Sequence, residues 1–123
     1  MSFVSTDVIN SLGRMDRSSA DNQPFGVVQV DDDGVIKMYN KWESDMAGVS
    51  VSDAEGKNFF TQVAPCTNNR LVFGKFKQGV QGDELDKEFN YTFTYKMKPT
   101  NVVIRLLRDS ANNNWVFVSK RAA

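Results

Sequence analysis

The residue of this chain best suited to covalent chemistry is Cys66, the single cysteine in a sequence of 123 residues that contains no histidine. A lone thiol cannot form an internal disulfide or a metal site built from several cysteines. Histidine, the usual base that activates a catalytic cysteine, is also missing. The simplest remaining chemistry for Cys66 is to carry a covalent group, although a single cysteine is more often an inert, buried small hydrophobe.

Composition narrows the classes of protein to which the chain can belong. Hydrophobic residues make up 41% and charged residues 24%, which are ordinary values for one globular domain with its own core. Because 15 basic residues balance 15 acidic ones, nothing indicates nucleic acid or an anionic membrane as a partner. Residues 1–15 do not resemble a secretory signal, and no apolar run approaches the roughly 20 residues of a membrane span. With one unpaired cysteine, we expect a cytoplasmic protein, and we expect it to be a monomer.

Residues 1–24 are polar and loosely patterned, and we interpret them as an N-terminal cap packed on the main body. The elements expected within the cap are an amphipathic turn around Val8, Ile9 and Leu12, with Thr6 or Asp7 as its N-cap, and a loop over residues 18–24. Because its apolar pattern is the weakest in the chain, the cap is expected to be the least stable part of the protein.

Residues 25–123 are expected to form the core of the single domain. The clearest signal is the alternation of apolar and polar residues over residues 89–97, which is typical of a half-buried strand. The expected strands cover residues 25–30, 35–39, 89–97, 102–107 and 115–118, with turns over residues 31–34, 98–101 and 109–114. The expected helices cover residues 40–48, 50–55, 58–63 and 71–80.

This order of elements predicts an α+β fold. Two leading strands and three trailing strands around a helical insert favour a five-stranded antiparallel sheet with short helices on one face. The order is similar to that of a PAS-type sensor domain, which holds a small ligand between its sheet and its helices. In such a fold, residues 39–43, 63–67 and 91–97 should converge on the ligand.

Six short segments stand out by their order and spacing: Tyr39-Asn40 with Glu43, Gly56-Lys57-Asn58-Phe59-Phe60, Val63-Ala64-Pro65-Cys66-Thr67, Gly74-Lys75-Phe76-Lys77, Tyr91-Thr92-Phe93 with Tyr95 and Met97, and Trp115-Val116-Phe117-Val118. In this order and at this spacing, they resemble the photoactive yellow protein family of bacterial blue-light receptors over residues 25–120. Each segment alone is a weak signal, but together they indicate a PAS-fold blue-light photoreceptor.

The resemblance implies a chromophore and a set of residues around it. The chromophore would be 4-hydroxycinnamic acid (p-coumaric acid), joined to Cys66 as a thioester whose carbonyl meets the backbone N–H of Cys66. Tyr39 and Glu43 would donate hydrogen bonds to its phenolate oxygen. Phe93 would form a wall of the pocket, and Met97 would assist the return to the dark state. Further residues expected to affect the pocket and recovery are Ala47, Val49, Phe59, Pro65, Thr67 and Tyr91.

The chemistry of Tyr39 and Glu43 is consistent with this role. A phenolate buried without partners would take up a proton, whereas two charge-assisted hydrogen bonds can keep it ionised. Glu43 must then be a neutral acid, which burial favours. After light isomerises the chromophore from trans to cis, Glu43 would donate its proton and become a buried carboxylate. We expect that charge to release the cap, and the partly unfolded protein to act on an unknown downstream signalling protein.

Three positions depart from the best-known members of the family. Ala47 replaces a threonine whose hydroxyl would support the tyrosine, and Val49 replaces an arginine that would shield the pocket. Trp42 is bulky where a small residue is usual, so that it would lie on the surface or alter the rim of the pocket. These departures are expected to change hue or recovery rate rather than abolish colour.

Other interpretations of the same residues stay open. Asn40 and Glu43 have the spacing of an N-cap asparagine with a glutamate at N3, close to a capping box, which would explain both without a ligand. Tyr39 could end a strand with its hydroxyl in water. The alternative function is a PAS-like module that binds no pigment and serves protein interaction or small-ligand sensing. An enzyme is not expected, because the sequence offers no metal-ligand cluster, phosphate loop or catalytic dyad.

Overall fold

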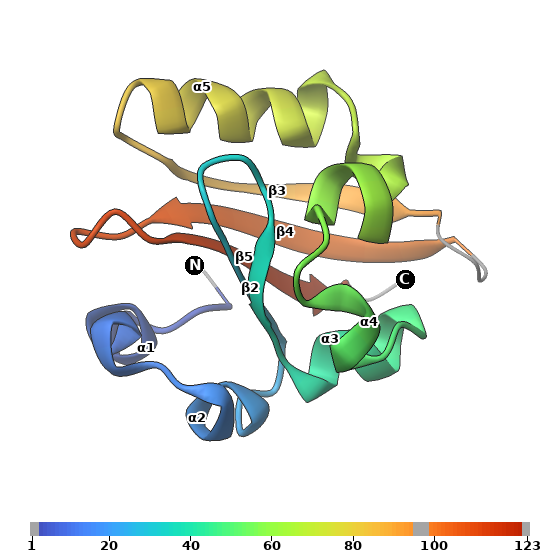
Figure 1. Cartoon of the computed structure of the whole chain (residues 1–123), viewed down its shortest axis with the longest axis horizontal. Coiled ribbons are helices and arrows are strands. Elements are labelled where there is room, and N and C mark those ends of the chain that lie inside the picture. The colour runs from blue at the N-terminus through green and yellow to red at the C-terminus, as the bar shows by residue number, and fades with distance from the viewer. Residues whose placement is uncertain (1–2, 95–98, 122–123) are drawn as a thin grey trace.

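The sheet has five antiparallel strands in the spatial order β2-β1-β5-β4-β3 (Figure 1). The structure is a computed structural model that describes residues 3–94 and 99–121. The strands are β1 (Gly26–Val30), β2 (Ile36–Tyr39), β3 (Asp86–Phe93), β4 (Thr100–Arg108) and β5 (Asn114–Lys120). The predicted α+β class and five-stranded antiparallel sheet are confirmed.

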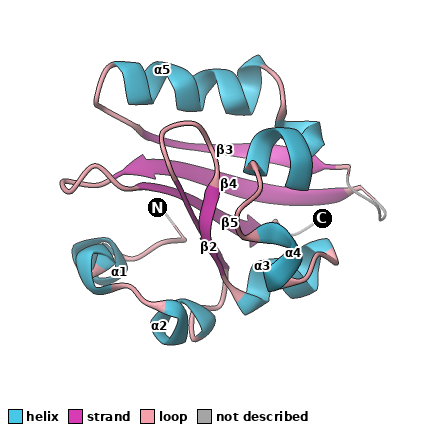
Figure 2. Ribbon diagram, viewed as in Figure 1, coloured by secondary structure: helices cyan, strands magenta, loops and turns pink. Residues whose placement is uncertain are grey.

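Helices lie at the start of the chain and between β2 and β3 (Figure 2). The α-helices are α1 (Thr6–Asn10), α2 (Arg17–Asp21), α3 (Lys41–Ala47), α4 (Val51–Ala54) and α5 (Lys75–Gln81). Between them lie 3-10 turns at Leu12–Arg14 and Pro65–Thr67, and π-helical turns at Phe59–Val63 and Arg70–Gly74. The two predicted groups of helices are therefore present, but several are only one turn long.

Each face of the sheet carries its own apolar cluster, because successive side chains of a strand point to opposite faces. Val27 faces one cluster and Val28 the other. The helix-side core joins the sheet to α3, α4, α5 and the π-helical turns, and it includes Val28, Ile36, Tyr39, Met46, Phe60, Phe76, Phe93 and Ile104. The cap-side core joins the other face to the N-terminal segment, residues 3–24, and contains Val4, Leu12, Ala20, Phe25, Val27, Met38, Leu107, Trp115 and Phe117.

The N-terminal segment contains more helix than its sequence predicted. The loop expected over residues 18–24 is wrong at its start, because α2 occupies Arg17–Asp21. Asp16 and Ser19 form a reciprocal capping box, in which the Asp16 carboxylate accepts from the Ser19 N–H at 2.8 Å. The expected N-cap of α1 is also wrong, since Ser5 and not Thr6 or Asp7 accepts the capping bond.

The helix expected over residues 71–80 is divided in two. A π-helical turn over Arg70–Gly74 precedes α5, which begins at Lys75. The side-chain oxygen of Asn69 accepts hydrogen bonds from the N–H groups of Leu71 and Val72, at 2.9 and 3.1 Å. This cap sets the start of the first turn, which i+3 and i+4 spacing alone did not locate.

The strand boundaries also differ from the expected ones. The turn expected over residues 98–101 ends earlier, since Thr100 and Asn101 already belong to β4. Thr100 pairs with Phe93, and Asn101 accepts a side-chain hydrogen bond from Thr92 at 2.9 Å. Cross-strand pairing therefore extends β4 into a region whose sequence favours a turn.

One polar network around Arg108 joins the β1–β2 turn, the segment before β3 and the start of β5. Arg108 donates to Asp32 in the β1–β2 turn and to Asp83 before β3, at 2.8 and 2.7 Å. It also donates to the buried Asn114 at 2.8 Å, and Asn114 in turn donates to Asp32 at 2.9 Å. The network therefore holds these three segments together.

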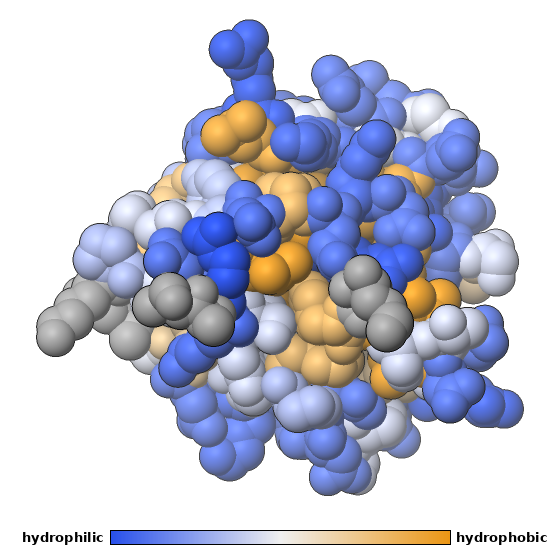
Figure 3. Space-filling model, turned by 180° about the vertical axis from the view of Figure 1, so that it is seen from behind, coloured by the Kyte–Doolittle hydropathy of each residue, from blue (hydrophilic) through white to orange (hydrophobic). Residues whose placement is uncertain are grey.

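The exposed surface mixes polar and apolar residues. Seen from behind, apolar residues gather in the middle of the face and polar residues surround them (Figure 3). Within residues 3–94 and 99–121, none of the helices has the length and apolar character needed to cross a membrane.

Candidate functional site

Tyr39 is the last residue of β2, and Glu43, four residues later, lies in the first turn of α3. Both side chains are completely buried. Burial, and to a lesser extent the neighbouring Glu43 carboxyl, raises the pKa of the Tyr39 phenol above its ordinary value. Tyr39 is therefore a neutral phenol that can donate a hydrogen bond over the whole physiological pH range.

The hydroxyl of Tyr39 is an unusual buried group. Its oxygen is shielded from solvent and has no hydrogen-bond partner among the described residues. A buried polar group without a partner costs free energy, and such groups in native proteins call for an explanation. A ligand atom that accepts a hydrogen bond from Tyr39 would satisfy this hydroxyl.

The position of the Glu43 side chain is set by close packing against β1. A β-carbon added to Gly26 would collide with the Oε1 oxygen of Glu43, and would lie 3.3 Å from both Glu43 Cδ and Trp42 Cε3. Only glycine leaves room for the carboxyl at this point. Gly26 therefore decides where the Glu43 carboxyl sits, a role that the sequence did not reveal.

Asn40 connects Glu43 to the N-terminal segment. Its side-chain oxygen accepts from the N–H groups of Glu43 and Val27, at 3.1 and 3.0 Å. Its side-chain nitrogen donates to the carbonyls of Ala20 and Phe25, at 2.8 and 3.0 Å. The expected N-cap role of Asn40 is confirmed. Its own backbone N–H donates to Val27 and not to Glu43, so the two residues do not form a reciprocal capping box.

Cys66 lies at the other end of the site, in the 3-10 turn Pro65–Thr67. Its thiol is free and half-buried, and its side chain packs against the helix-side core to which Tyr39 belongs. The buried hydroxyl of Thr67 donates to the carbonyl of Ala64 at 2.6 Å, which closes the turn. Proline at the first position of the turn lacks an N–H that would otherwise be unsatisfied.

The backbone of Cys66 is held by two polar side chains. The hydroxyl of Tyr91, on β3, donates to the Cys66 carbonyl at 2.6 Å. Asn69 donates to the same carbonyl at 3.1 Å and to the Tyr91 hydroxyl at 2.7 Å. These three bonds form a triangle that ties the Cys66 turn to the sheet. The sequence indicated Tyr91 but missed Asn69, whose place before a helix is a readable N-cap signal.

The other expected site residues have different surroundings. Phe59 and Phe93 are fully buried in the helix-side core, and Ala47 is fully buried at the end of α3. Pro65 is exposed, and Met97 lies outside the described residues.

Val49, the second departure from the resemblance, directly follows Gly48, the C-cap of α3. It is half-buried, packs against the helix-side core, and lines a surface cleft of about 300 Å³ together with Val63 and Gln62. Trp42, the third departure from the resemblance, is half-buried and packs against the same core, so it is not a fully exposed surface residue.

No metal centre is found in the part of the chain that the structure describes. Within residues 3–94 and 99–121, no group of three or more carboxylate or cysteine side chains is placed to hold a metal ion. The polar groups of the site are instead a phenol, a carboxyl and a thiol. These three groups suit hydrogen bonding and thioester formation with an organic ligand.

Comparisons with known proteins identify the family. The PAS fold family matches residues 14–118. Photoactive yellow proteins from Rhodothalassium salexigens and Halochromatium salexigens are 36% and 37% identical over 119 residues, which cover 96% of this chain and 95% of each relative.

Solved structures agree with these relatives. The crystal structure of the photoactive yellow protein domain from the sensor histidine kinase Ppr of Rhodospirillum centenum is 38% identical. It matches with a TM-score of 0.85, covering 90% of this chain and 98% of that domain. A PAS domain of an HTR-like protein from Haloarcula marismortui, 15% identical with a TM-score of 0.62, shares the fold alone. The chain therefore belongs to the photoactive yellow protein family, within the PAS fold.

Proposed function

We propose that this protein is a blue-light photoreceptor that carries 4-hydroxycinnamic acid as a thioester on Cys66. The observation that carries the proposal is the buried Tyr39 hydroxyl, which has no partner among the described residues and neighbours the buried Glu43 carboxyl. The half-buried thiol of Cys66 packs against the same core, so one elongated ligand could span the three groups. The photoactive yellow proteins from Rhodothalassium salexigens and Halochromatium salexigens support the same assignment.

Tyr39 and Glu43 would bind the phenolate end of the chromophore. Tyr39 donates from its Oη atom, and Glu43 donates from its carboxyl as a neutral acid, since complete burial disfavours a carboxylate. Hydrogen bonds to an ionised acceptor are roughly twice as strong as neutral ones. Two such donors would therefore keep a phenolate ionised in the interior.

When bound, the chromophore supplies the absorption of blue light and the trans-to-cis isomerisation. Glu43 then gives up its proton and holds a negative charge in a fully buried position. The effective penalty for one buried ion is several kcal/mol, compared with a total stability of about 5–15 kcal/mol for a domain. One proton transfer at Glu43 is thus large enough to loosen part of the fold.

The N-terminal segment is the part that we expect to loosen. Asn40 accepts a hydrogen bond from the N–H of Glu43 and donates one to Ala20 in α2, so it connects the new charge to the segment directly. A shift of the first turn of α3 would disturb both bonds. Release of residues 3–24 would uncover the cap-side core, including Trp115 and Phe117, which could then bind a partner.

The nature of that partner is suggested by one relative. The solved photoactive yellow protein domain from Rhodospirillum centenum belongs to a sensor histidine kinase. We therefore propose that the output is a protein–protein interaction in a signalling pathway and not a chemical reaction catalysed by this chain.

The test is reconstitution with an activated ester of 4-hydroxycinnamic acid. We expect the purified chain to turn yellow and to gain the mass of one hydroxycinnamoyl group, with both changes lost in Cys66→Ala. A mass gain that persists in Cys66→Ala would place the attachment elsewhere. If the wild-type chain gains neither colour nor mass, the photoreceptor proposal fails and a PAS module without pigment becomes the better explanation.

A further inference from the structure

Tyr39 lies on the edge strand of the sheet, so its backbone cannot be satisfied by a second strand on that side. β2 pairs only with β1 in the described sheet, where Tyr39 is opposite Val28. The neighbouring N–H of Asn40 donates to Val27, so the N–H and C=O of Tyr39 point away from β1. These two backbone groups need partners from outside the sheet.

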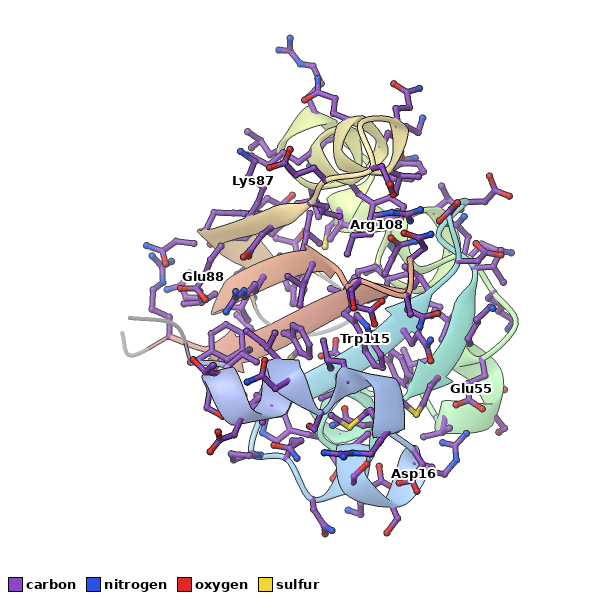
Figure 4. All side chains as sticks on the ribbon, turned by 90° about the vertical axis from the view of Figure 1, so that its left-hand side faces the viewer. Asp16, Glu55, Lys87, Glu88, Arg108 and Trp115 are labelled. Carbon is purple, nitrogen blue, oxygen red and sulfur yellow. The ribbon has the colours of Figure 1, made fainter. Side chains whose placement is uncertain are left out.

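The partners come from two segments that are far apart in the sequence. The Tyr39 N–H donates to Oε2 of Glu55, the residue that follows α4, at 3.1 Å. Arg17, in the first turn of α2, directs Nη1 toward the Tyr39 carbonyl oxygen at 3.5 Å. Nη2 of Arg17 also contacts both carboxylate oxygens of Glu55, at 2.7 and 2.5 Å. Figure 4 shows Glu55 and the α2 cap residue Asp16 at the same end of the molecule.

We propose that Glu55 is a positioning residue for Tyr39, and that Arg17 ties the N-terminal segment to the same point. This inference rests on the proposed function, because it assigns Glu55 and Arg17 to the hydrogen-bond donor of the chromophore site. Glu55 fixes the peptide from which the buried phenol extends. Arg17 then makes the position of that peptide depend on whether α2 is docked.

The contacts of Arg17 and Glu55 with each other and with the Tyr39 backbone are called the clamp below. Their strength suits a contact that must open. The side chain of Arg17 is 49% exposed and that of Glu55 is 25% exposed, so water and salt can compete for the ion pair. The geometry still favours arginine, because its planar guanidinium can meet the carboxylate and the carbonyl together. The clamp therefore orients Tyr39 in the dark without holding α2 irreversibly.

Three substitutions separate the two roles of the clamp. Glu55→Ala removes the acceptor of the Tyr39 N–H and the ion pair, whereas Glu55→Gln keeps an oxygen acceptor and removes only the charge. Arg17→Ala removes the ion pair and leaves Glu55 on Tyr39. The first readout is amide hydrogen exchange in the protein without pigment, which needs no assumption about colour.

We expect Glu55→Ala to accelerate exchange of the Tyr39 amide about tenfold or more, and Glu55→Gln to keep it within about threefold of wild type. Arg17→Ala should accelerate exchange in α2 and leave the Tyr39 amide protected. Raising salt to about 1 M should reproduce the effect of Arg17→Ala in the wild type. If Glu55→Ala leaves the Tyr39 amide as protected as in wild type, the clamp does not position Tyr39.

The second readout is the absorption spectrum of the reconstituted protein. Glu55→Ala should shift the absorption maximum, while Glu55→Gln should not, because only the former frees the Tyr39 peptide. An unchanged spectrum in Glu55→Ala, together with faster Tyr39 exchange, would overturn the positioning role. If wild type takes up no pigment at all, the proposed function fails, and the exchange experiment still decides whether the clamp exists.

Discussion

The two ends of the site differ in burial and in what they are attached to. At the Tyr39 and Glu43 end, both side chains are completely buried. The backbone of these two residues is joined to the N-terminal segment, Tyr39 directly by Arg17 and Glu43 through Asn40. At the Cys66 end, the thiol is half-buried, and its turn is tied to the sheet through Tyr91. The difference suggests a division of work. In the proposed function, the end that excludes water would transmit the change, and the half-buried thiol would serve for covalent attachment.

The largest effect is expected from a substitution at the buried end that prevents Glu43 from giving up a proton. Glu43→Gln keeps the shape of the side chain and a hydrogen-bond donor but cannot become a carboxylate. In the reconstituted protein, we expect the light-induced rise in hydrogen exchange over residues 3–24 to fall about tenfold or more, because no buried charge forms. Mass spectrometry of exchange in light and dark measures this change.

The matched control for that experiment is the other end of the site. Thr67→Val removes the hydroxyl that closes the Cys66 turn and leaves Glu43 unchanged. It should preserve the light-induced exchange over residues 3–24. A Glu43→Gln protein that still shows the full response would mean that charge at this position does not drive the change.

A smaller effect is expected from moving Glu43 without changing its chemistry. In Gly26→Ala, the new methyl group collides with the Glu43 carboxyl, which must shift. We expect a loss of about 1–3 kcal/mol in the free energy of unfolding, as is typical of overpacking. We also expect a shifted absorption maximum after reconstitution. Gly13→Ala is the control, since a β-carbon there meets nothing within 4 Å.

Substitution of Asn69 should disturb the Cys66 end alone. Asn69→Ala removes the cap of the π-helical turn and two of the three bonds in the Cys66 triangle. We expect a loss of about 1 kcal/mol in the free energy of unfolding. Asn69→Asp keeps the capping oxygen but cannot donate to the Cys66 carbonyl. Recovery kinetics should change in both proteins, while exchange over residues 3–24 in the dark stays at the wild-type rate. Faster exchange there would contradict the separation of the two ends.

The smallest effect concerns acid pH and the N-terminal segment. Hydrogen bonds from the backbone and side chain of Ser19 lower the pKa of Asp16 below its ordinary value of 3.8. A lowered pKa in the folded state means that Asp16 stabilises α2 above pH 3.8 and that this contribution is lost as the pH falls further. Amide exchange in α2 should therefore accelerate at the lowest pH, after correction for the intrinsic rate. Asp16→Asn, which caps without titrating, should remove this dependence.

Local signals in the sequence explain which elements could be predicted. The helix after β2 was predicted correctly because Asn40 caps its start and Gly48 ends it with φ near 71°. The hairpin before it follows from Gly34, whose φ of 95° suits a tight turn. The helix α2 was missed because its Ser-rich sequence has weak propensity, although the Asp16 and Ser19 pair was a readable capping signal.

By itself, the sequence determined the fold class, the family and the candidate groups at Tyr39, Glu43 and Cys66, because these depend on periodicity and on short motifs. It could not determine that Gly26 limits the position of Glu43, or that Arg17 and Glu55 meet at the Tyr39 backbone. Arg17 and Glu55 are 38 residues apart, and no local pattern relates them. Contacts of this kind depend on how the edge of the sheet and the N-terminal segment come together, so only the tertiary structure decided them.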